Sequence, residues 1–257
     1  MLNLSQSARF DELSVAVPNF IRYPTIRKLA ERVQYETLNA SARNAVASSA
    51  LNDAHNHSHH SHNASRSARI LDSLYQTPIA DASILVAITH ERHPKLLLTR
   101  RAAHMNSHAG EVSCAGGKYE TGDGNNVVTA LREACEETAL PPNKVQLLGQ
   151  LPIQTSKSGM SVRPIVALIA PDLVLVPELG EISRIFWADF ETLLTQPTVE
   201  YSIEYAMQDQ MATILTPSWQ VDGETVWGLT GRVIASLLET GFDRQLEWYY
   251  RIQESQL

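Results

Sequence analysis

The sequence predicts an α+β protein in which helices cover both faces of a mixed β-sheet, an α/β/α sandwich. Three observations support this fold class. Short apolar runs bounded by turn residues, which are typical of strands, are interspersed with helical patterns. Their order does not follow a regular β-α-β alternation, and the chain contains no internal repeat. Hydrophobic residues make up 44% of the 257 residues, which is enough for a packed core.

Residues 1–47 are predicted to form an N-terminal helical extension. Residues 25–46 have helical periodicity, with one apolar stripe at Ile26, Leu29, Val33 and Leu38. Residues 48–70 are rich in Ser, Asn and His, and this composition predicts a linker. A metal-binding tract is the alternative interpretation, because the segment contains five of the nine histidines, at His55, His57, His59, His60 and His62.

The pattern of a compact domain begins at residue 79 and continues to residue 242. Strands are predicted at residues 82–91, 95–101, 144–153, 163–176 and 183–190. Helices are predicted at residues 125–140, which Pro141 and Pro142 terminate, and at residues 190–196. Residues 219–242 are predicted as a strand, a turn and a strand that lead into a helix, and residues 243–257 as a polar C-terminal tail.

Composition excludes several classes of function. Lys and Arg total 21 against 28 Asp and Glu, a net charge of −7, whereas proteins that bind nucleic acids or anionic membranes usually carry the opposite charge. No run approaches the ~18–20 apolar residues of a membrane span, and the first residues lack a signal-peptide pattern. Two cysteines, Cys114 and Cys135, are too few for a disulfide scaffold. We therefore expect a soluble, cytoplasmic protein that binds neither nucleic acid nor membranes.

The segment that carries the chemistry is 116–140. Glu133, Glu136 and Glu137 lie at i, i+3 and i+4, so their carboxylates share one face of the predicted helix. The opposite face carries the side chains expected to pack on the sheet, Val128, Leu131 and Cys135. Crowded carboxylates repel each other unless a cation neutralises them, and oxygen ligands suit Mg²⁺ or Mn²⁺. A solvated helix face is the alternative for three glutamates alone, but Arg132 and the upstream Gly116–Gly117 turn favour a metal site.

These residues resemble the Nudix hydrolase pattern G-x5-E-x7-R-E-U-x-E-E-x-G-U, in which U is a bulky apolar residue. Residues 117–140 match it at Arg132, Glu133, Glu136, Glu137 and Leu140. Ala134 is a small U, Ala139 replaces the last glycine, and the loop from Gly117 to Arg132 is one residue longer. Either Asp123 or Glu120 replaces the first glutamate. The resemblance implies a Nudix-type sandwich.

The residues ahead of this pattern resemble one branch of the family, the coenzyme A pyrophosphatases. The leader of that branch is L-L-T-x-R-[SA]-x3-R-x3-G-x3-F-P-G-G, and residues 97–117 read LLTRRAAHMNSHAGEVSCAGG. The matches are Leu97, Leu98, Thr99, Arg101, Ala102, Gly110, Gly116 and Gly117. Asn106 replaces the second arginine, and Cys114 and Ala115 replace Phe-Pro. The resemblance covers residues 80–240, most of the chain.

The resemblance also implies roles for individual residues. Glu133, Glu136 and Glu137 would bind Mg²⁺ or Mn²⁺, while Arg132 would orient a loop carboxylate such as Asp123 or, alternatively, contact a phosphate. The general base differs among Nudix enzymes, being a glutamate of the pattern or one from a later loop, so Glu181 is a candidate base, extra ligand or plain surface residue. The candidate substrate-binding residues are Arg101, Gly116 and Gly117, because the glycines would let the backbone turn tightly and approach a diphosphate. His104 and His108 could titrate nearby or simply satisfy local hydrogen bonds.

Three functions are therefore considered. The first is a Mg²⁺- or Mn²⁺-dependent pyrophosphatase that converts coenzyme A to 4′-phosphopantetheine and adenosine 3′,5′-bisphosphate. The second is a Nudix hydrolase for ADP-ribose, dinucleoside polyphosphates or another nucleotide, motivated by Asn106, Cys114 and Ala115. The third is a non-catalytic nucleotide-sensing module, against which the complete set of glutamates argues. The sequence is compatible with a homodimer.

Overall fold

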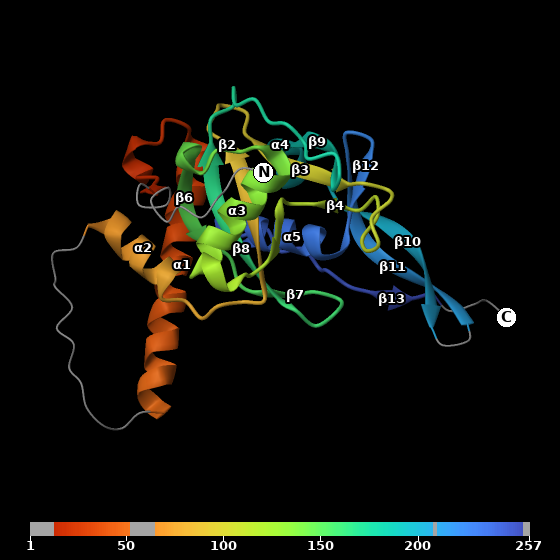
Figure 1. The fold of residues 1–257 in the computed structure, drawn as a ribbon, viewed down its shortest axis with the longest axis horizontal. Coiled ribbons are helices and arrows are strands. Elements are labelled where there is room, and N and C mark those ends of the chain that lie inside the picture. The colour runs from red at the N-terminus through yellow and green to blue at the C-terminus, as the bar shows by residue number, and fades with distance from the viewer. Residues whose placement is uncertain (1–12, 52–64, 208–209, 254–257) are drawn as a thin grey trace.

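The structure is a computed structural model that describes residues 13–51, 65–207 and 210–253 (Figure 1). In this part of the chain the helices are α1 (Pro24–Leu51), α2 (Arg66–Tyr75), α3 (Asn126–Thr138), α4 (Phe190–Thr195) and α5 (Gly228–Phe242). The strands of the main sheet are β1 (Ser14–Val15), β2 (Ala82–Thr89), β3 (Lys95–Arg101), β4 (Val112–Ser113), β5 (Gly116–Lys118), β6 (Val145–Gln150), β7 (Gln154–Thr155), β8 (Ser161–Ile169) and β9 (Ile182–Asp189). A second sheet contains β10 (Val199–Met207), β11 (Gln210–Val221), β12 (Glu224–Val226) and β13 (Arg251–Ile252).

The main sheet is mixed, as predicted. Its strand order is β1-β6-β8-β2-β3-β4, with β5 paired to β2, β7 to β8 and β9 to β3. The β2–β8 and β1–β6 pairs are parallel, whereas the other pairs are antiparallel. Because β5 and β3 both pair with β2, Gly116, Gly117 and Arg101 come from two strands that share this neighbour.

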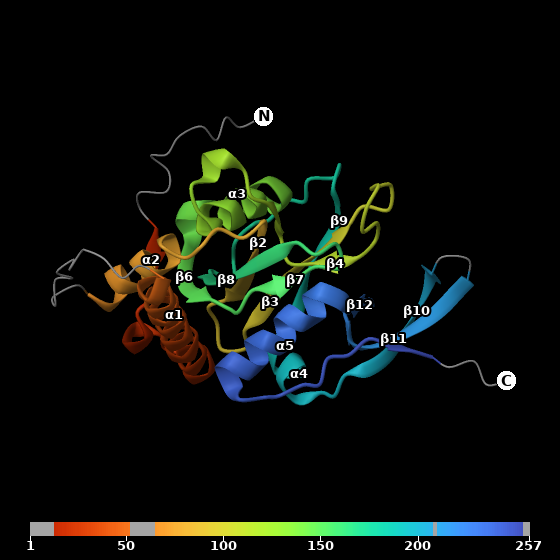
Figure 2. The ribbon, with the colours of Figure 1, turned by 90° about the horizontal axis from the view of Figure 1, so that it is seen from below.

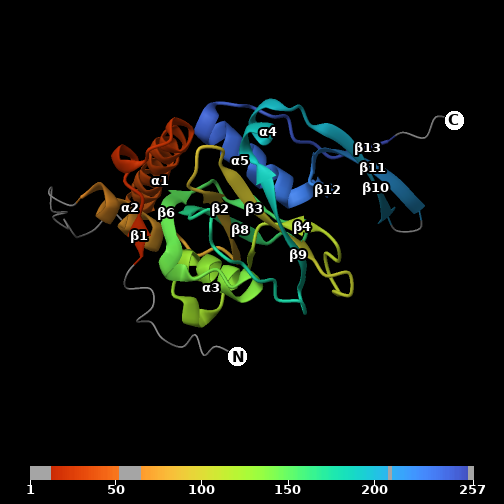
Figure 3. The ribbon, with the colours of Figure 1, turned by 90° about the horizontal axis from the view of Figure 1, so that it is seen from above.

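Helices cover both faces of this sheet, which confirms the predicted α/β/α sandwich (Figures 2 and 3). The side chains of β2 alternate between two hydrophobic clusters. Leu85 and Ala87 belong to the cluster that contains α2 and α3, whereas Val86 and Ile88 belong to the cluster that contains α1 and α5. The candidate site lies on the α3 side. Among the described residues, no helix is long and apolar enough to span a membrane.

Helix α1 covers most of the predicted N-terminal extension and continues through residues 48–51, which were predicted as linker. It packs closely on the sheet and on α5. Ile26, Leu29 and Val33 of the predicted stripe are buried, and Leu38 is partly buried. Gly149 of β6 permits this approach, because a Cβ atom at its position would lie 2.2 Å from Thr37 Oγ1. Gly241 of α5 does the same for Leu29 Cδ1, at 2.5 Å. The side chains of α1 therefore contribute to the same hydrophobic cluster as the sheet.

Several local predictions need correction. The linker prediction missed helix α2, which Ser65 caps and which buries Ile70 and Leu74 against the sheet. The five histidines of that segment lie outside the described residues. The strand predicted at 163–176 ends at Ile169, because Pro171 lacks a backbone N–H and the following residues run as a loop beside α3. The segment predicted as a polar tail instead carries Trp248, which stacks on Trp219 at a centroid distance of 5.5 Å.

The packing face of α3 was also predicted slightly wrongly. Val128 and Cys135 are only half-buried, and the face on the sheet consists of Val127, Ala130, Leu131 and Ala134. Compared with the prediction, the face of α3 that packs on the sheet is shifted toward Glu137. The side chain of Glu137 is itself buried against the edge of the sheet.

Candidate functional site

Helix α3 presents its three glutamates at three different depths. The helix begins where the Asn125 side chain accepts hydrogen bonds from two backbone N–H groups, and it ends at Ala139, a left-handed residue with φ 56°. The side chain of Glu137 is 5% exposed, that of Glu133 18% and that of Glu136 47%. The carboxylates thus form a line from the sheet edge to the solvent.

Glu137 is the deepest of the three. Its Oε2 accepts a hydrogen bond from the Gly116 backbone N–H at 3.2 Å, and its Oε1 lies 3.6 Å from Nη1 of Arg101. Burial raises the pKa of Glu137 to about 8, and the nearby charges of Glu133 and Glu181 add to the effect. The Gly116 hydrogen bond and Arg101 oppose this rise without cancelling it. The pKa of Glu137 therefore lies well above the ordinary value of a glutamate.

The Gly116–Gly117 pair accommodates its neighbours closely. A Cβ atom at Gly116 would lie 2.4 Å from the Ser83 carbonyl oxygen, so glycine allows β5 to pair with β2. A Cβ atom at Gly117 would lie 2.4 Å from Oε1 of Glu133, so glycine makes room for that carboxylate. Burial raises the pKa of Glu133, helped by Glu136 and Glu181 and opposed by Arg132. Gly117 therefore determines where the Glu133 carboxylate lies.

Arg132 connects the helix to the loop before it. Its Nε and Nη2 donate to the two carboxylate oxygens of Asp123, at 2.8 and 3.1 Å, which is the predicted pairing. Its Nη1 donates to Glu133 at 2.9 Å and to Glu136 at 3.0 Å, and Nη2 also donates to the Lys118 carbonyl. The bond to Asp123 is the main reason that the pKa of Arg132 lies above its ordinary value.

Asp123 occupies the position of the first glutamate of the pattern. Burial alone would raise its pKa, but hydrogen bonds from Arg132, the Glu120 backbone and Thr129 outweigh burial and lower it. The neighbouring Glu120 forms a reciprocal capping box with Asp123 instead of reaching α3. Of the two predicted candidates, Asp123 is therefore the partner of Arg132.

Glu181 ends the loop 170–181, which runs beside the C-terminal turn of α3. The backbone N–H groups of Val176 and Glu178 donate to the carbonyls of Thr138 and Glu137, both at 2.9 Å. The Ala102 N–H donates to the Glu181 carbonyl at 2.7 Å, which ties this loop to the end of β3. Glu181 is exposed, and its charge contributes to the raised pKa values of Glu133 and Glu137. The structure thus brings Glu181 to the same site as the glutamates of α3.

Other predicted candidates have local partners. His108 pairs with Glu111 at 2.8 Å. Arg100, which precedes the candidate Arg101 in β3, pairs with Glu224 at 3.3 Å. Cys114 is buried, and burial raises the pKa of its thiol to about 12, so it is not a nucleophile. His104 contacts the Gly180 carbonyl at 3.0 Å and thus supports the loop of Glu181, a role that its sequence position did not reveal.

The donor set suits a hard divalent cation. Asp123, Glu133, Glu136, Glu137 and Glu181 place five carboxylates near two guanidinium groups, those of Arg101 and Arg132. An excess of negative charge with only oxygen donors is the chemistry that Mg²⁺ and Mn²⁺ prefer. Within the described ranges, however, no three side chains of His, Cys, Asp or Glu are gathered in a metal-binding arrangement. Arg132 occupies oxygens of Asp123, Glu133 and Glu136. Binding of a cation would require the glutamates to exchange arginine contacts for metal contacts.

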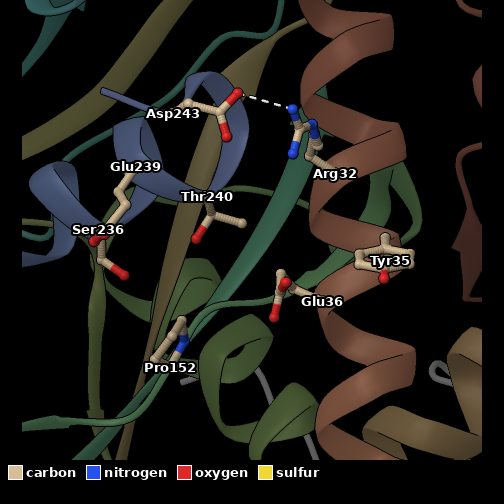
Figure 4. Close-up of a pocket in the computed structure, with 8 residues that line it drawn as sticks. All are labelled: Arg32, Tyr35, Glu36, Pro152, Ser236, Glu239, Thr240 and Asp243. Carbon is tan, nitrogen blue, oxygen red and sulfur yellow. Dashed lines mark hydrogen bonds and ion pairs between the residues drawn. The ribbon is translucent and has the colours of Figure 1, made fainter. Parts of the chain in front are cut away.

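Two surface hollows lie outside this group of residues. One, of about 360 Å³, lies between α1 and α5 and is lined by polar side chains that include Arg32, Glu36 and Asp243 (Figure 4). The other, of about 510 Å³, is lined by Arg184, Phe186 and further residues of β9 and β11. Neither is lined by a predicted site residue.

Comparison with known proteins identifies similar sequences. A model of the NUDIX domain matches residues 80–208. Relatives named "Uncharacterized Nudix hydrolase NudL" include the protein of Pectobacterium atrosepticum, 38% identical over 61% of this chain and 80% of that protein. The protein of Escherichia coli K12 with the same name is 35% identical over 61% of this chain and 80% of its own length.

The solved structures that match this chain have lower sequence identity. An Ap4A hydrolase of C. elegans is 18% identical over 43% of this chain and 80% of that chain, with a TM-score of 0.37. The NUDIX domain of Shewanella oneidensis NrtR, complexed with ADP ribose, is 21% identical over 47% of this chain and 79% of that chain, with a TM-score of 0.36. Similarity at this level carries no argument about the ligand of this chain.

Proposed function

The chain belongs to the Nudix family, and on that premise we propose that it is a metal-dependent pyrophosphatase whose substrate is coenzyme A or a derivative of it. Water would cleave the pyrophosphate to give 4′-phosphopantetheine and adenosine 3′,5′-bisphosphate. The observation that carries the proposal is the convergence of Glu133, Glu137 and Arg101 on the Gly116–Gly117 strand. This strand ends the leader that resembles the coenzyme A branch.

Glu133, Glu136 and Glu137 are the residues that would hold Mg²⁺ or Mn²⁺. The bound ion would supply neutralisation of the charge that a phosphoanhydride carries. Arg101 lies beside the deepest carboxylate and would move its guanidinium from Glu137 to a phosphate oxygen. Arg132, which already bonds three carboxylates, would keep Asp123 and the helix in position.

Glu181 is our candidate for the general base. It is exposed, and no arginine in the described part of the chain forms an ion pair with it as Arg132 does with Glu133 and Glu136, so its carboxylate is accessible to water. The hydrogen bond between Ala102 and its carbonyl fixes its backbone near Arg101. Glu178 is an exposed glutamate of the same loop and serves as a matched control for substitutions.

Two of the three departures from the coenzyme A leader concern buried residues. Cys114 is 2% exposed and Ala115 is 1% exposed, so their side chains pack in the two hydrophobic clusters. The presence of Cys114 and Ala115 in place of Phe-Pro therefore changes the packing of the core. It places no exposed side chain that could distinguish one substrate from another. Only Asn106 is exposed, in the loop between β3 and β4. This supports coenzyme A over ADP-ribose or dinucleoside polyphosphates, the alternatives that these departures suggested.

The test is a substrate panel read by product chromatography. Coenzyme A, acyl-coenzyme A, ADP-ribose and diadenosine polyphosphates are each incubated with the full chain and Mg²⁺ or Mn²⁺. We expect the fastest turnover for a coenzyme A compound, with loss of nearly all activity in Glu137→Gln and a large loss in Glu181→Gln but not in Glu178→Gln. Faster turnover of ADP-ribose or a dinucleoside polyphosphate would replace the substrate assignment. Binding without turnover of any pyrophosphate would instead support the nucleotide-sensing module.

A further inference from the structure

The hairpin of β10 and β11, here called the arm, projects from the body of the molecule (Figures 1 and 3). Its two strands pair in unbroken antiparallel register from Val199–Ser218 to Met207–Gln210. Strand β11 also pairs with β12 and β13 on its second edge. Strand β10 has β11 on one edge, and no strand in the described part of the chain pairs with its other edge. The arm therefore presents one row of backbone N–H and C=O groups without a strand partner.

This edge lacks most of the usual protection against pairing. Proteins commonly blunt an exposed edge with proline, charged side chains (lysine above all), a bulge or a very short strand. Strand β10 is nine residues long, about 30 Å, and its sequence VEYSIEYAM contains neither proline nor lysine, so Glu200 and Glu204 are its only charged residues. Its register with β11 contains no bulge. A straight edge of this length is a template for another strand.

One face of the arm is apolar and partly exposed. Val199 and Ile203 lie on the same face of β10, because they are four residues apart. Ile214 lies on this face through its pairing with Ile203, and Ile252 through its pairing with Ile214. Val199 is 56% exposed and Ile252 is 55% exposed. Pairing of β10 with a further strand would continue this apolar face and reduce its contact with water.

The charge on β10 permits pairing with an identical strand. Glu200 is neutralised within the chain, because Arg251 Nη2 and the Tyr249 hydroxyl both donate to its Oε2 at 2.8 Å. Glu204 accepts a hydrogen bond from Thr213 and has no cation partner in the described ion pairs. A strand that pairs with β10 therefore cannot place a second carboxylate directly opposite Glu204 without repulsion.

We propose that β10 pairs antiparallel with β10 of a second copy of this chain, in a two-fold dimer whose sheet runs through both arms. With the axis at Ile203, this residue faces the partner's Ile203, and Ser202 faces the partner's Glu204. No two carboxylates are then directly opposite, and the same patch serves both subunits, as a two-fold interface requires. The dimer contact involves neither α3 nor the loop of Glu181, so its test is independent of catalysis.

Charge variants at Ser202 test this register. Ser202 is exposed, so the monomer tolerates substitution there. Ser202→Glu would create two like-charge pairs with Glu204 across the axis and should weaken the dimer about fivefold, whereas Ser202→Lys would create two opposite-charge pairs and tighten it by a similar factor. Met211→Glu on β11 is the matched control, because Met211 is 65% exposed but lies away from the β10 edge. Sedimentation velocity of the full chain over a concentration series measures each dissociation constant, and circular dichroism checks folding.

A second measurement tests the axis directly. Directly opposed residues in an antiparallel pair are close enough for a disulfide, so Ile203→Cys should form a covalent dimer on oxidation. Thr213→Cys, on β11, should not. Opposite shifts for the two Ser202 variants, with no shift for Met211→Glu, support the dimer. A wild-type chain that stays monomeric at every soluble concentration overturns it, as does a dimer that neither Ser202 variant changes.

Discussion

Substitution of Gly117 by alanine tests whether the close approach of Glu133 to β5 matters for activity. The new Cβ atom would lie 2.4 Å from Glu133 Oε1, whereas van der Waals contact needs about 3.5 Å, so the carboxylate has to move by about 1 Å. The backbone at Gly117 does not have a positive φ, so alanine introduces no backbone strain. Misplacement of a reacting group by 1 Å costs about 100-fold in rate, or about 2.7 kcal/mol in the activation barrier.

The assay is kcat/KM with the best substrate of the panel, together with the midpoint of thermal unfolding. We expect Gly117→Ala to lose about 100-fold in kcat/KM with a nearly unchanged midpoint, since the displaced group is the end of a flexible side chain. Gly122→Ala is the matched control, because a Cβ atom there would meet no atom within 4 Å. Wild-type turnover in Gly117→Ala, or an equal loss in Gly122→Ala, would refute the assignment of Glu133 to the site.

Three further predictions concern stability and pH. Ala139→Gly should raise the free energy of unfolding by about 1 kcal/mol in chemical denaturation, because Ala139 has φ 56°, which glycine adopts without strain; an unchanged or lower value contradicts this. Asp123→Asn should reduce the free energy of unfolding by about 1–3 kcal/mol at neutral pH. The folded-state pKa of Asp123 is lowered, so its stabilisation is present above its unfolded pKa and lost as pH falls through the folded one. The difference in unfolding free energy between wild type and variant should therefore begin to shrink below about pH 4, and a difference that stays constant at lower pH would contradict this. The pKa of Glu137 is raised to about 8, so a cation that binds this carboxylate has to displace its proton. The apparent affinity for Mn²⁺, measured by calorimetry, should therefore rise from pH 6 to pH 8. An affinity that does not change over this range would show that Glu137 is not a ligand.

The parts of the fold that were predictable are those whose pattern is local. The apolar runs of β2 and β3 and the periodicity of α3 identify these elements without knowledge of their neighbours. Helix α2 has only two fully buried large apolar side chains, so its sequence resembles the polar segment before it and its stability depends on tertiary contacts. Strand pairing is also non-local: β13 pairs with residues of β11 that lie far away in the sequence.

The candidate site was predictable in its residue types but not in its contacts. The spacing of the glutamates predicted a shared helix face, yet their burial differs widely because the edge of β5 covers Glu137 and leaves Glu136 in solvent. The two glycines were expected to approach a diphosphate or to form a simple turn, and the structure adds that each makes room for a protein atom. Such contacts depend on which strand lies beside β5, and the sequence does not specify that.

The two arginines lie at different distances from the carboxylates of the site, and this difference indicates which glutamate would bind a cation most favourably. Arg132 makes hydrogen bonds of 2.8–3.1 Å to its carboxylates, so Asp123, Glu133 and Glu136 share a nearby positive charge. Arg101 lies 3.6 Å from Glu137, beyond a normal hydrogen bond, and this carboxylate is also the most buried. Among the three glutamates of α3, Glu137 is therefore the one that the arginines compensate least, and a cation that approaches the Gly116–Gly117 strand gains most by replacing its proton. Glu136, being exposed and held by Arg132, gains least, so its substitution should cost less activity than substitution of Glu137.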